Sequence, residues 1–313
     1  MRLGVLDVGS NTVHLLVVDA HPGASPVPTA SHKRVLRLAE RLDEEGSVHA
    51  EGVADLLDVV RSAREVATSE GVEELMGFAT SALREAPNGA GVLEDVRRET
   101  GVRLEVLSGG AEARLTFFAV RRWFGWSAGR MLVLDIGGGS LELAMGADED
   151  AEVALSVPLG AGRTTRSHLA GGVTRPRDVA GLREHAREVL EAQAGRLRDQ
   201  GAPDLVVGSS KTFRTLGRLT GAAPAREGMH VPRSLERAAL EELVPRLASL
   251  GPAGRRRLAG VSDARAGQVV AGAVVALEAM RVLDVERMAL SPWALREGVI
   301  LRRLDALAPL LGR

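Results

Sequence analysis

LGVLDVGSNTVHLLVVD, at residues 3–19, shares its pattern with MLVLDIGGGSLELAMG, at residues 131–146. In each stretch an apolar strand ends in an aspartate, a tight turn follows, and a second apolar strand begins. An offset of 128 residues places Asp7 on Asp135 and His14 on Glu142. An internal repeat of this kind predicts two similar domains, and two such domains facing each other would leave a cleft between them.

The segments around the repeats alternate between strand and helix patterns. Apolar positions 53, 56, 57, 60, 63 and 67 follow helical spacing, which predicts a helix over 53–69. Such alternation is typical of an α/β fold with a largely parallel sheet. Further strands are predicted near 35–39, 74–80, 102–107 and 204–208, and further helices at 92–100, from about 111, at 177–198 and at 267–280.

The spacing of the two repeats also predicts where the domains divide. The boundary is expected near residues 123–130, which gives a first domain at 1–125 and a second at 126–300. The last helix, 301–313, is expected to pack back on the first domain.

Composition limits the classes of function. Hydrophobic residues at 45% and charged residues at 26% are ordinary for a globular protein, and no stretch approaches the ~20 apolar residues of a membrane span. Because the chain has no cysteine, it forms no disulfide or thiolate nucleophile, and we expect a cytoplasmic protein. The net charge of −1 gives no basic field, so nucleic-acid binding is not expected. The cluster Lys33, Arg34, Arg37 and Arg41 is interpreted as a solvated face.

Both repeat turns are candidate anion sites. A strand that ends in a Gly/Ser/Asn turn directs several backbone N–H groups one way, and such a concavity binds phosphate without side-chain charge. Glycines in the second turn allow positive φ and a close approach of the backbone. A plain hairpin is the alternative for either turn alone. The candidate phosphate-binding residues are Asp7, Ser10, Asn11, Thr12, Gly137, Gly138, Gly139 and Ser140.

Carboxylates beside these turns are candidate metal ligands. Mg²⁺ prefers oxygen ligands and often binds through one or two carboxylates, with waters and substrate phosphates completing its shell. Asp135 and Glu142 are predicted to hold Mg²⁺, or Mn²⁺ in its place, with Asp7 joining from the first domain. The alternative is turn capping by the aspartates and solvent exposure of Glu142.

Glu112 is the candidate general base. It follows the turn Ser108–Gly110 at the start of a predicted helix, where it can orient and deprotonate an attacking water. The helix dipole favours the ionised carboxylate and lowers its basicity, whereas crowding by other acids raises it. A carboxylate in a first helical turn is also often only a partner of the dipole.

Two further segments are candidate phosphate contacts. Arg84 lies on a helix that follows a strand, where its guanidinium can clamp a pair of phosphate oxygens. Ser209, Ser210 and Lys211 lie between a strand and a helix, and this arrangement predicts a second anion site. No G-x-x-x-x-G-K-[ST] motif occurs in the chain, so a Walker-type NTPase is not indicated.

The motifs, taken in order, resemble the exopolyphosphatase and guanosine pentaphosphate phosphohydrolase family, within the actin-like superfamily. The resemblance runs nearly end to end. It rests on DVGSNTVHLLV (7–17), ATSALREA (79–86), LSGGAEARL (107–115), LDIGGGSLEL (134–143), VPLG (157–160), VGSSKTFRTLGRL (207–219) and PWALREGVIL (292–301).

This resemblance implies two actin-like domains and hydrolytic release of terminal orthophosphate from inorganic polyphosphate. It implies that Glu112 is the catalytic glutamate and that Asp135 and Glu142 are associated with magnesium. It also favours a homodimer. Two departures stand out: Ala111 replaces a second glutamate of many members, and the chain ends at Arg313 without the further domains of the long enzymes. A short form is expected to favour shorter chains.

Three alternatives stay open at this point. Guanosine pentaphosphate is a possible substrate in the same family, and adenine nucleotides are possible ligands. An actin-like fold can also phosphorylate a small molecule with ATP. A weakly catalytic polyphosphate or nucleotide sensor is the third.

Overall fold

The computed structural model describes residues 1–21, 23–169 and 174–311, which divide into two compact units. Unit 1 comprises Met1–Ser108 and Leu295–Arg313, and unit 2 comprises Gly109–Ala294. Both units are α/β, as the sequence predicts.

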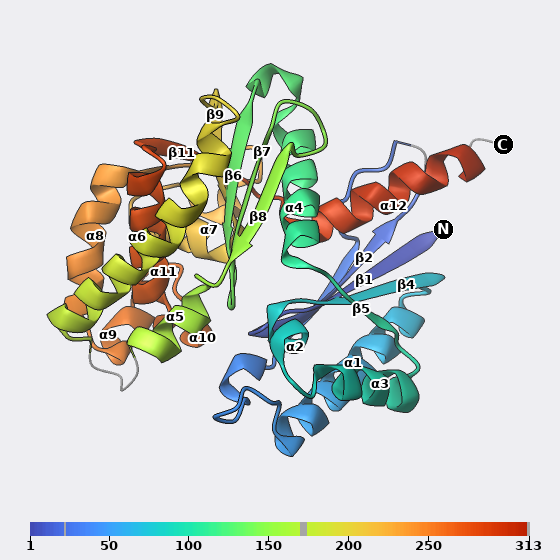
Figure 1. Cartoon of the computed structure of the whole chain (residues 1–313). Helices are drawn as coiled ribbons and strands as arrows, with labels where there is room; N and C mark the ends of the chain where they lie inside the picture. Colours follow the sequence, from blue (N-terminus) through green and yellow to red (C-terminus); the bar gives the residue numbers. More distant parts are fainter. Residues whose placement is uncertain (22, 170–173, 312–313) are drawn as a thin grey trace. The chain divides into compact units, whose positions relative to one another are not determined.

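Unit 1 is a five-stranded sheet with helices on both faces (Figure 1). Helices α1 and α3 cover one face, where Leu56 and Val60 pack against Val13 and Leu15. Helix α12 covers the other. The strands, in the order β3-β2-β1-β4-β5, are β3 (Ala30–Val35), β2 (Thr12–Asp19), β1 (Arg2–Val8), β4 (Glu74–Ala79) and β5 (Leu104–Val106). The helices are α1 (Ala50–Ser69), α2 (Ser81–Glu85), α3 (Gly89–Thr100) and α12 (Leu295–Leu311), with a 3-10 turn η1 at Leu38–Glu40.

Unit 2 is a six-stranded sheet built on the same plan. Helix α4 (Gly109–Phe124) covers one face, and the other helices cover the opposite face (Figure 1). The strand order β10-β11-β9-β6-β7-β8 uses β6 (Met131–Ile136), β7 (Leu141–Gly146), β8 (Val153–Val157), β9 (Leu205–Ser209), β10 (Ser234–Glu236) and β11 (Arg287–Leu290). The other helices are α5 (Ala161–His168), α6 (Pro176–Arg198), α7 (Ser210–Leu219), α8 (Arg237–Ser249), α9 (Pro252–Arg256), α10 (Asp263–Ala266) and α11 (Val269–Val282), with 3-10 turns η2 (Trp126–Ala128) and η3 (Ala225–Glu227).

The internal repeat is a structural duplication. In unit 1 the order β3-β2-β1-β4-β5 has two antiparallel pairs followed by two parallel pairs, and β8-β7-β6-β9-β11 repeats it in unit 2. Asp7 pairs across the hairpin with His14, as Asp135 does with Glu142. The turn bonds agree as well, with Gly9 N–H to Thr12 O at 3.0 Å and Gly137 N–H to Ser140 O at 2.9 Å. This is the pair of similar α/β domains expected from the sequence.

Two local features differ from the sequence-based expectations. The strand expected near 35–39 lies at Ala30–Val35, because the Leu36 and Arg37 amides bond to Asn11 O and Arg37 takes a left-handed conformation that ends the strand. The division between units falls before α4, at Ser108/Gly109, and not near residue 125. The reason is that Phe117 and Val120 of α4 pack on β6 and β7.

Helix α11 is the innermost helix of unit 2, in keeping with its Ala, Gly and Val content. Its residues from Val269 to Met280 are all buried. Glu278, buried within it, is paired with Arg183 at 2.8 Å and Arg281 at 3.1 Å, which offsets the cost of burying a carboxylate. None of the described helices combines the length and apolar character needed to cross a membrane.

Candidate active site

The predicted residues of unit 2 gather at one edge of its sheet. Strands β6, β9 and β11 run parallel, so their carboxyl ends meet at the same edge, where open α/β sheets bind ligands. Asp135 and the glycine turn lie at the end of β6, and Ser209 lies at the end of β9 beside Asp135. Segments distant in sequence are therefore neighbours here.

The glycine turn is held from one side by helix α5. The Gly137 carbonyl accepts from Ala161 N–H at 3.0 Å, and the Gly138 carbonyl accepts from the amides of Gly162 and Arg163 at 2.9 Å. The Arg163 Nε donates to the Gly139 carbonyl at 2.8 Å. Because a trans peptide points its N–H opposite to its C=O, the N–H groups after these carbonyls point away from α5. They belong to Gly138, Gly139 and Ser140, which stay the candidate anion-binding amides.

Positive φ does not explain the glycines of this turn, whereas close packing against the turn explains Gly160 and Gly162 at the start of α5. Positive φ occurs at other glycines of the described chain, and Gly137, Gly138 and Gly139 are not among them. The positive φ that glycine allows is therefore not used in this turn. Packing is tight instead: a Cβ on Gly162 would lie 2.9 Å from the Gly138 carbonyl, and one on Gly160 would clash with the backbone of Gly139 and Ser140.

A buried pair of glutamates lies next to the glycine turn. Glu142 on β7 is 5% exposed, Glu112 in the first turn of α4 is 7% exposed, and their charges interact. Burial and the charges of Glu112 and Asp135 raise the pKa of Glu142 to about 8, against the lowering effect of hydrogen bonds from Ser140 and Ser156. The Ser156 hydroxyl donates to Glu142 at 2.9 Å. Glu142 is thus buried, contrary to the alternative of solvent exposure.

The buried carboxylates of Glu112, Asp135 and Glu142 repel one another, and a divalent cation between them would be stabilised. Like charges in a desolvated site repel, and a bound dication would remove that repulsion. In the part of the chain that the structure describes, no three His, Cys, Asp or Glu side chains are arranged as a complete metal centre. Asp135 and Glu142 would therefore supply two oxygen ligands, which matches the one or two carboxylates that Mg²⁺ uses with waters and phosphates. Asp7 belongs to unit 1, so its part in this metal site stays a prediction.

The start of α7 completes the edge of unit 2. The Thr212 hydroxyl donates to Ile136 O at 2.8 Å, which ties α7 to the end of β6 just before the glycine turn. The Ser209 hydroxyl donates to Trp293 O at 3.1 Å and is fully buried, so it serves the structure of this edge. Ser210 has φ 71°, a strained conformation for serine, and Lys211 beside it is exposed.

Two arginines of this site were missed from the sequence. Burial and the charge of Arg214 lower the pKa of Arg265 to about 10, and the charge of Asp135 opposes this shift. Arg265 donates to the Thr212 hydroxyl at 3.3 Å, and Arg214 donates to Pro292 O at 2.9 Å. Arg265 and Arg214 therefore place positive charge beside the acidic side chain of Asp135. No motif marks Arg265, since only the fold brings α10 to the end of β6.

The predicted residues of unit 1 gather at the equivalent edge. Asp7 keeps 22% of its side chain exposed, and burial of the rest raises its pKa to about 6. Arg296 on α12, 3.8 Å from Asp7, opposes that rise. The Ser10 hydroxyl is 3.1 Å from that of Ser81, which joins the turn to the start of α2. Asn11 lies in the turn, and Thr12 begins β2.

Arg84 lies on the same edge of unit 1, in a helix of one turn. Its Nη1 donates to Leu107 O at 2.8 Å, and its Nη2 is 3.7 Å from Glu85. The guanidinium thereby joins the segments that follow β4 and β5. This anchoring gives it a structural role, and its contact with phosphate stays a prediction.

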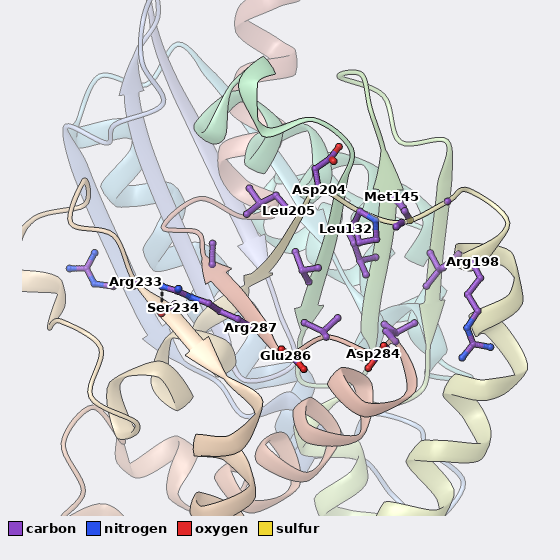
Figure 2. A pocket seen from close by; sticks show the side chains of 18 of the residues that line it. Leu132, Met145, Arg198, Asp204, Leu205, Arg233, Ser234, Asp284, Glu286 and Arg287 are labelled. Atoms are coloured by element: carbon purple, nitrogen blue, oxygen red, sulfur yellow. Dashed lines mark hydrogen bonds between the residues drawn. The ribbon is translucent and has the colours of Figure 1, made fainter.

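A separate cavity lies at the opposite edge of the unit 2 sheet (Figure 2). It has a volume of about 1070 Å³ and is lined by Leu132, Leu205 and Arg287, which lie at the amino ends of β6, β9 and β11. None of the predicted site residues lines it. Arg233 on its rim donates to Ala223 O and Val231 O, so it stabilises a loop.

One protein family matches most of the chain. The Ppx/GppA phosphatase family matches residues 16–307. The chain belongs to this family. It is 53% identical to Exopolyphosphatase 1 of Mycobacterium tuberculosis over 98% of the chain and 89% of that protein. It is 29% identical to the guanosine-5'-triphosphate,3'-diphosphate pyrophosphatase of Aeromonas hydrophila, over 94% of the chain and 58% of that protein. Membership makes the chain a hydrolase of phosphoric anhydrides.

Solved structures confirm the fold. An exopolyphosphatase from Cytophaga hutchinsonii superposes with a TM-score of 0.88 at 24% identity, covering 98% of both chains. A Ppx/GppA member from Aquifex aeolicus gives 0.79 at 24% identity, also covering 98% of both chains. At 24% identity these two structures support the fold of the chain and not its function.

Proposed function

We propose that this protein is an exopolyphosphatase, which releases terminal orthophosphate from inorganic polyphosphate. The observation that carries the proposal is the concavity of amides from Gly138 to Ser140 next to the buried pair Glu112 and Glu142. The amide concavity would bind a phosphate. Of the two glutamates, Glu112 would act as the general base and Glu142 as a metal ligand. The 53% identity to a mycobacterial exopolyphosphatase supports polyphosphate as the substrate.

In the proposed reaction a water oxygen attacks the terminal phosphorus, and the bond to the bridging oxygen breaks. Glu112 accepts the proton of the water, and the products are orthophosphate and a chain one phosphate shorter. The amides of the glycine turn stabilise charge on the transferring phosphate, as preorganised donors do in a desolvated site. Arg265 adds a fixed positive charge on the α10 side.

A divalent cation, Mg²⁺ or Mn²⁺, is part of the proposal. Asp135 and Glu142 would hold it, and it would neutralise phosphate charge and orient the leaving group. The two protein carboxylates leave most of its coordination to water and substrate oxygens. Removal of divalent cations is therefore expected to abolish phosphate release.

The test is phosphate release by wild type and by Glu112→Gln, measured with and without Mg²⁺ on tripolyphosphate and on longer polyphosphate. Loss of the base is expected to lower kcat by about 10²–10⁴-fold with little change in KM. Glu99→Gln is the matched control, because Glu99 is an exposed glutamate near a helix end. Wild-type turnover by Glu112→Gln would remove Glu112 from the chemistry.

Guanosine pentaphosphate hydrolysis is the second candidate. It is favoured by the 29% identity to the Aeromonas pyrophosphatases, whose named substrate also carries a terminal phosphoric anhydride. Release from guanosine pentaphosphate without release from polyphosphate would select this alternative. ATP-dependent phosphorylation of an added alcohol would select a kinase.

A further inference from the structure

Ser156 holds one oxygen of the buried Glu142 side chain. The two residues lie opposite each other on β8 and β7, and the serine hydroxyl donates to Oε1 of Glu142 at 2.9 Å. Residues paired in this way lie on the same face of a sheet, with Cβ atoms about 4.5–5.5 Å apart. Glu142 is 5% exposed, whereas Ser156 is exposed on an edge strand, because β8 ends the sheet order. Ser156 therefore contacts the carboxylate from the edge of the sheet.

The other oxygen of Glu142 faces the glycine turn. Oε2 lies 4.0 Å from the position that a Cβ on Gly137 would take, whereas Oε1 is the atom bonded to Ser156. The Ser140 hydroxyl also hydrogen-bonds to this carboxylate. The bond from Ser156 thus holds Oε1 towards β8 and leaves Oε2 on the side of the turn, beside the candidate anion-binding amides.

The fold itself does not require a serine at this position. Strand β3 of unit 1 corresponds to β8 of unit 2, and Lys33 pairs there with His14 as Ser156 pairs with Glu142. The side chain at this position is exposed in both units, so it belongs to neither core. What distinguishes unit 2 is the neighbour, which is a buried acid. The hydroxyl of Ser156 therefore serves Glu142 and not the packing of the sheet.

We propose that Ser156 is a positioning residue for the metal site and acts through Glu142. This rests on the proposed function, in which Asp135 and Glu142 would hold a divalent cation. Hydrogen bonds that orient a ligating carboxylate strengthen metal binding, and loss of such a partner typically costs about 10- to 100-fold in metal affinity or activity. Without the hydroxyl, the Glu142 carboxylate is free to rotate away from the glycine turn, and the cation is bound more weakly.

The experiment measures Mg²⁺ binding in the absence of substrate. Thermal melts of wild type, Ser156→Ala and Ser156→Thr at pH 8.5 over a range of Mg²⁺ concentrations give the apparent affinity for the metal alone. Ser249→Ala is the matched control, because the Ser249 hydroxyl is also exposed and also donates one bond of 2.9 Å, to Arg246 O at the end of α8. Ser140 is left intact, because it also supplies an amide to the turn.

Ser156→Ala is expected to weaken Mg²⁺ binding by about 10-fold or more, so its thermal midpoint should rise only at higher Mg²⁺ concentrations. Ser156→Thr keeps the hydroxyl and should restore the affinity, and Ser249→Ala should not change it. In the phosphate-release assay, Ser156→Ala should need correspondingly more Mg²⁺ for its half-maximal rate and should keep kcat at saturating Mg²⁺ close to that of wild type. In a Glu142→Gln background it should have no further effect on Mg²⁺ binding, since both changes act on one carboxylate.

Equal Mg²⁺ affinity in wild type and Ser156→Ala would overturn the inference, and so would a loss that Ser156→Thr does not restore. A lower midpoint without Mg²⁺, combined with unchanged Mg²⁺ affinity, would assign Ser156 to folding instead. A wild type that binds Mg²⁺ and releases no phosphate from polyphosphate would contradict the proposed function alone, because the metal is measured without substrate. A wild type whose midpoint does not respond to Mg²⁺ would overturn both.

Discussion

Glu142 shows what burial does to a single side chain in this site. Burial and the neighbouring acids raise its pKa from 4.5 to about 8. Since the folded-state pKa exceeds the unfolded one, the protonated glutamate contributes stability below about pH 4.5. This contribution is lost as pH rises through about 8, because the unfolded chain ionises more easily. Without a metal, stability should fall between pH 5 and 8.

Mg²⁺ is expected to reverse this trend, because it binds the ionised carboxylate. The thermal midpoint of wild type should therefore rise more on addition of Mg²⁺ at pH 8.5 than at pH 6. Glu142→Gln should remove most of the pH dependence and most of the Mg²⁺ effect. Thermal melts at several pH values check this. A Mg²⁺ shift that is the same at both pH values in wild type would contradict it.

The sequence predicted those site residues that lie within a local motif. Asp135, Glu142 and the glycine turn were found because strand, aspartate and turn are adjacent in sequence and occur twice. Arg265 and Ser156 were not found. Their roles depend on the packing of α10 near β6 and on the pairing of β8 with β7, which no local pattern encodes.

At the scale of elements, hydrogen bonds and close packing hold α5 against the glycine turn. Gly160→Ala should separate them, because the new Cβ would clash with the backbone of Gly139 and Ser140. Gly160 has φ −68° and ψ 147°, which alanine adopts freely, so the effect is steric. We expect a loss of about 1–3 kcal/mol in the free energy of unfolding and a fall in kcat of at least about 10²-fold.

Gly181→Ala is the control for that substitution. Gly181 lies inside α6 with no atom within 4 Å of an added Cβ, so alanine should stabilise the helix by up to about 1 kcal/mol. Urea unfolding and phosphate release are measured on both variants. If Gly160→Ala kept wild-type activity, the packing of α5 would not be what orients the turn amides.

The sequence predicted a helix or strand best where the spacing of its apolar side chains determines it. The helix predicted at 53–69 lies at Ala50–Ser69, since its buried positions recur at helical spacing. The strand expected near 35–39 was displaced because a backbone contact ends it, namely the bonds of the Leu36 and Arg37 amides to Asn11. Backbone contacts between distant residues leave little trace in a sequence.

At the scale of the whole molecule, the sequence predicted the duplication but not the division between units. Helix α4 is buried on more than one side, and its apolar residues alone do not say which sheet it covers. Helix α12 differs in this respect: its sequence follows unit 2, and its apolar side chains pack on the sheet of unit 1, where the last helix was expected.

This arrangement predicts different behaviour for the two units when they are separated. All core residues of unit 2 come from one continuous segment, so residues 109–294 should fold alone and unfold cooperatively. Residues 1–108 lack α12, so they would expose the face formed by Leu3, Val5 and Phe78. Losing the burial of Ile300, Leu304 and Leu307 costs roughly 1.5–3 kcal/mol each, which is comparable to the whole stability of a domain, about 5–15 kcal/mol.

Residues 1–108 should therefore give no cooperative thermal transition by circular dichroism. Joining them to residues 295–311 through a flexible linker of about 20 residues should restore one, because the missing helix can then cover its face of the sheet. The same fusion with Ile300→Asp and Leu304→Asp controls for linker and length, and it should remain unfolded. A cooperative transition in residues 1–108 alone would mean that the α1 and α3 face is sufficient, and that α12 contributes less than its burial implies.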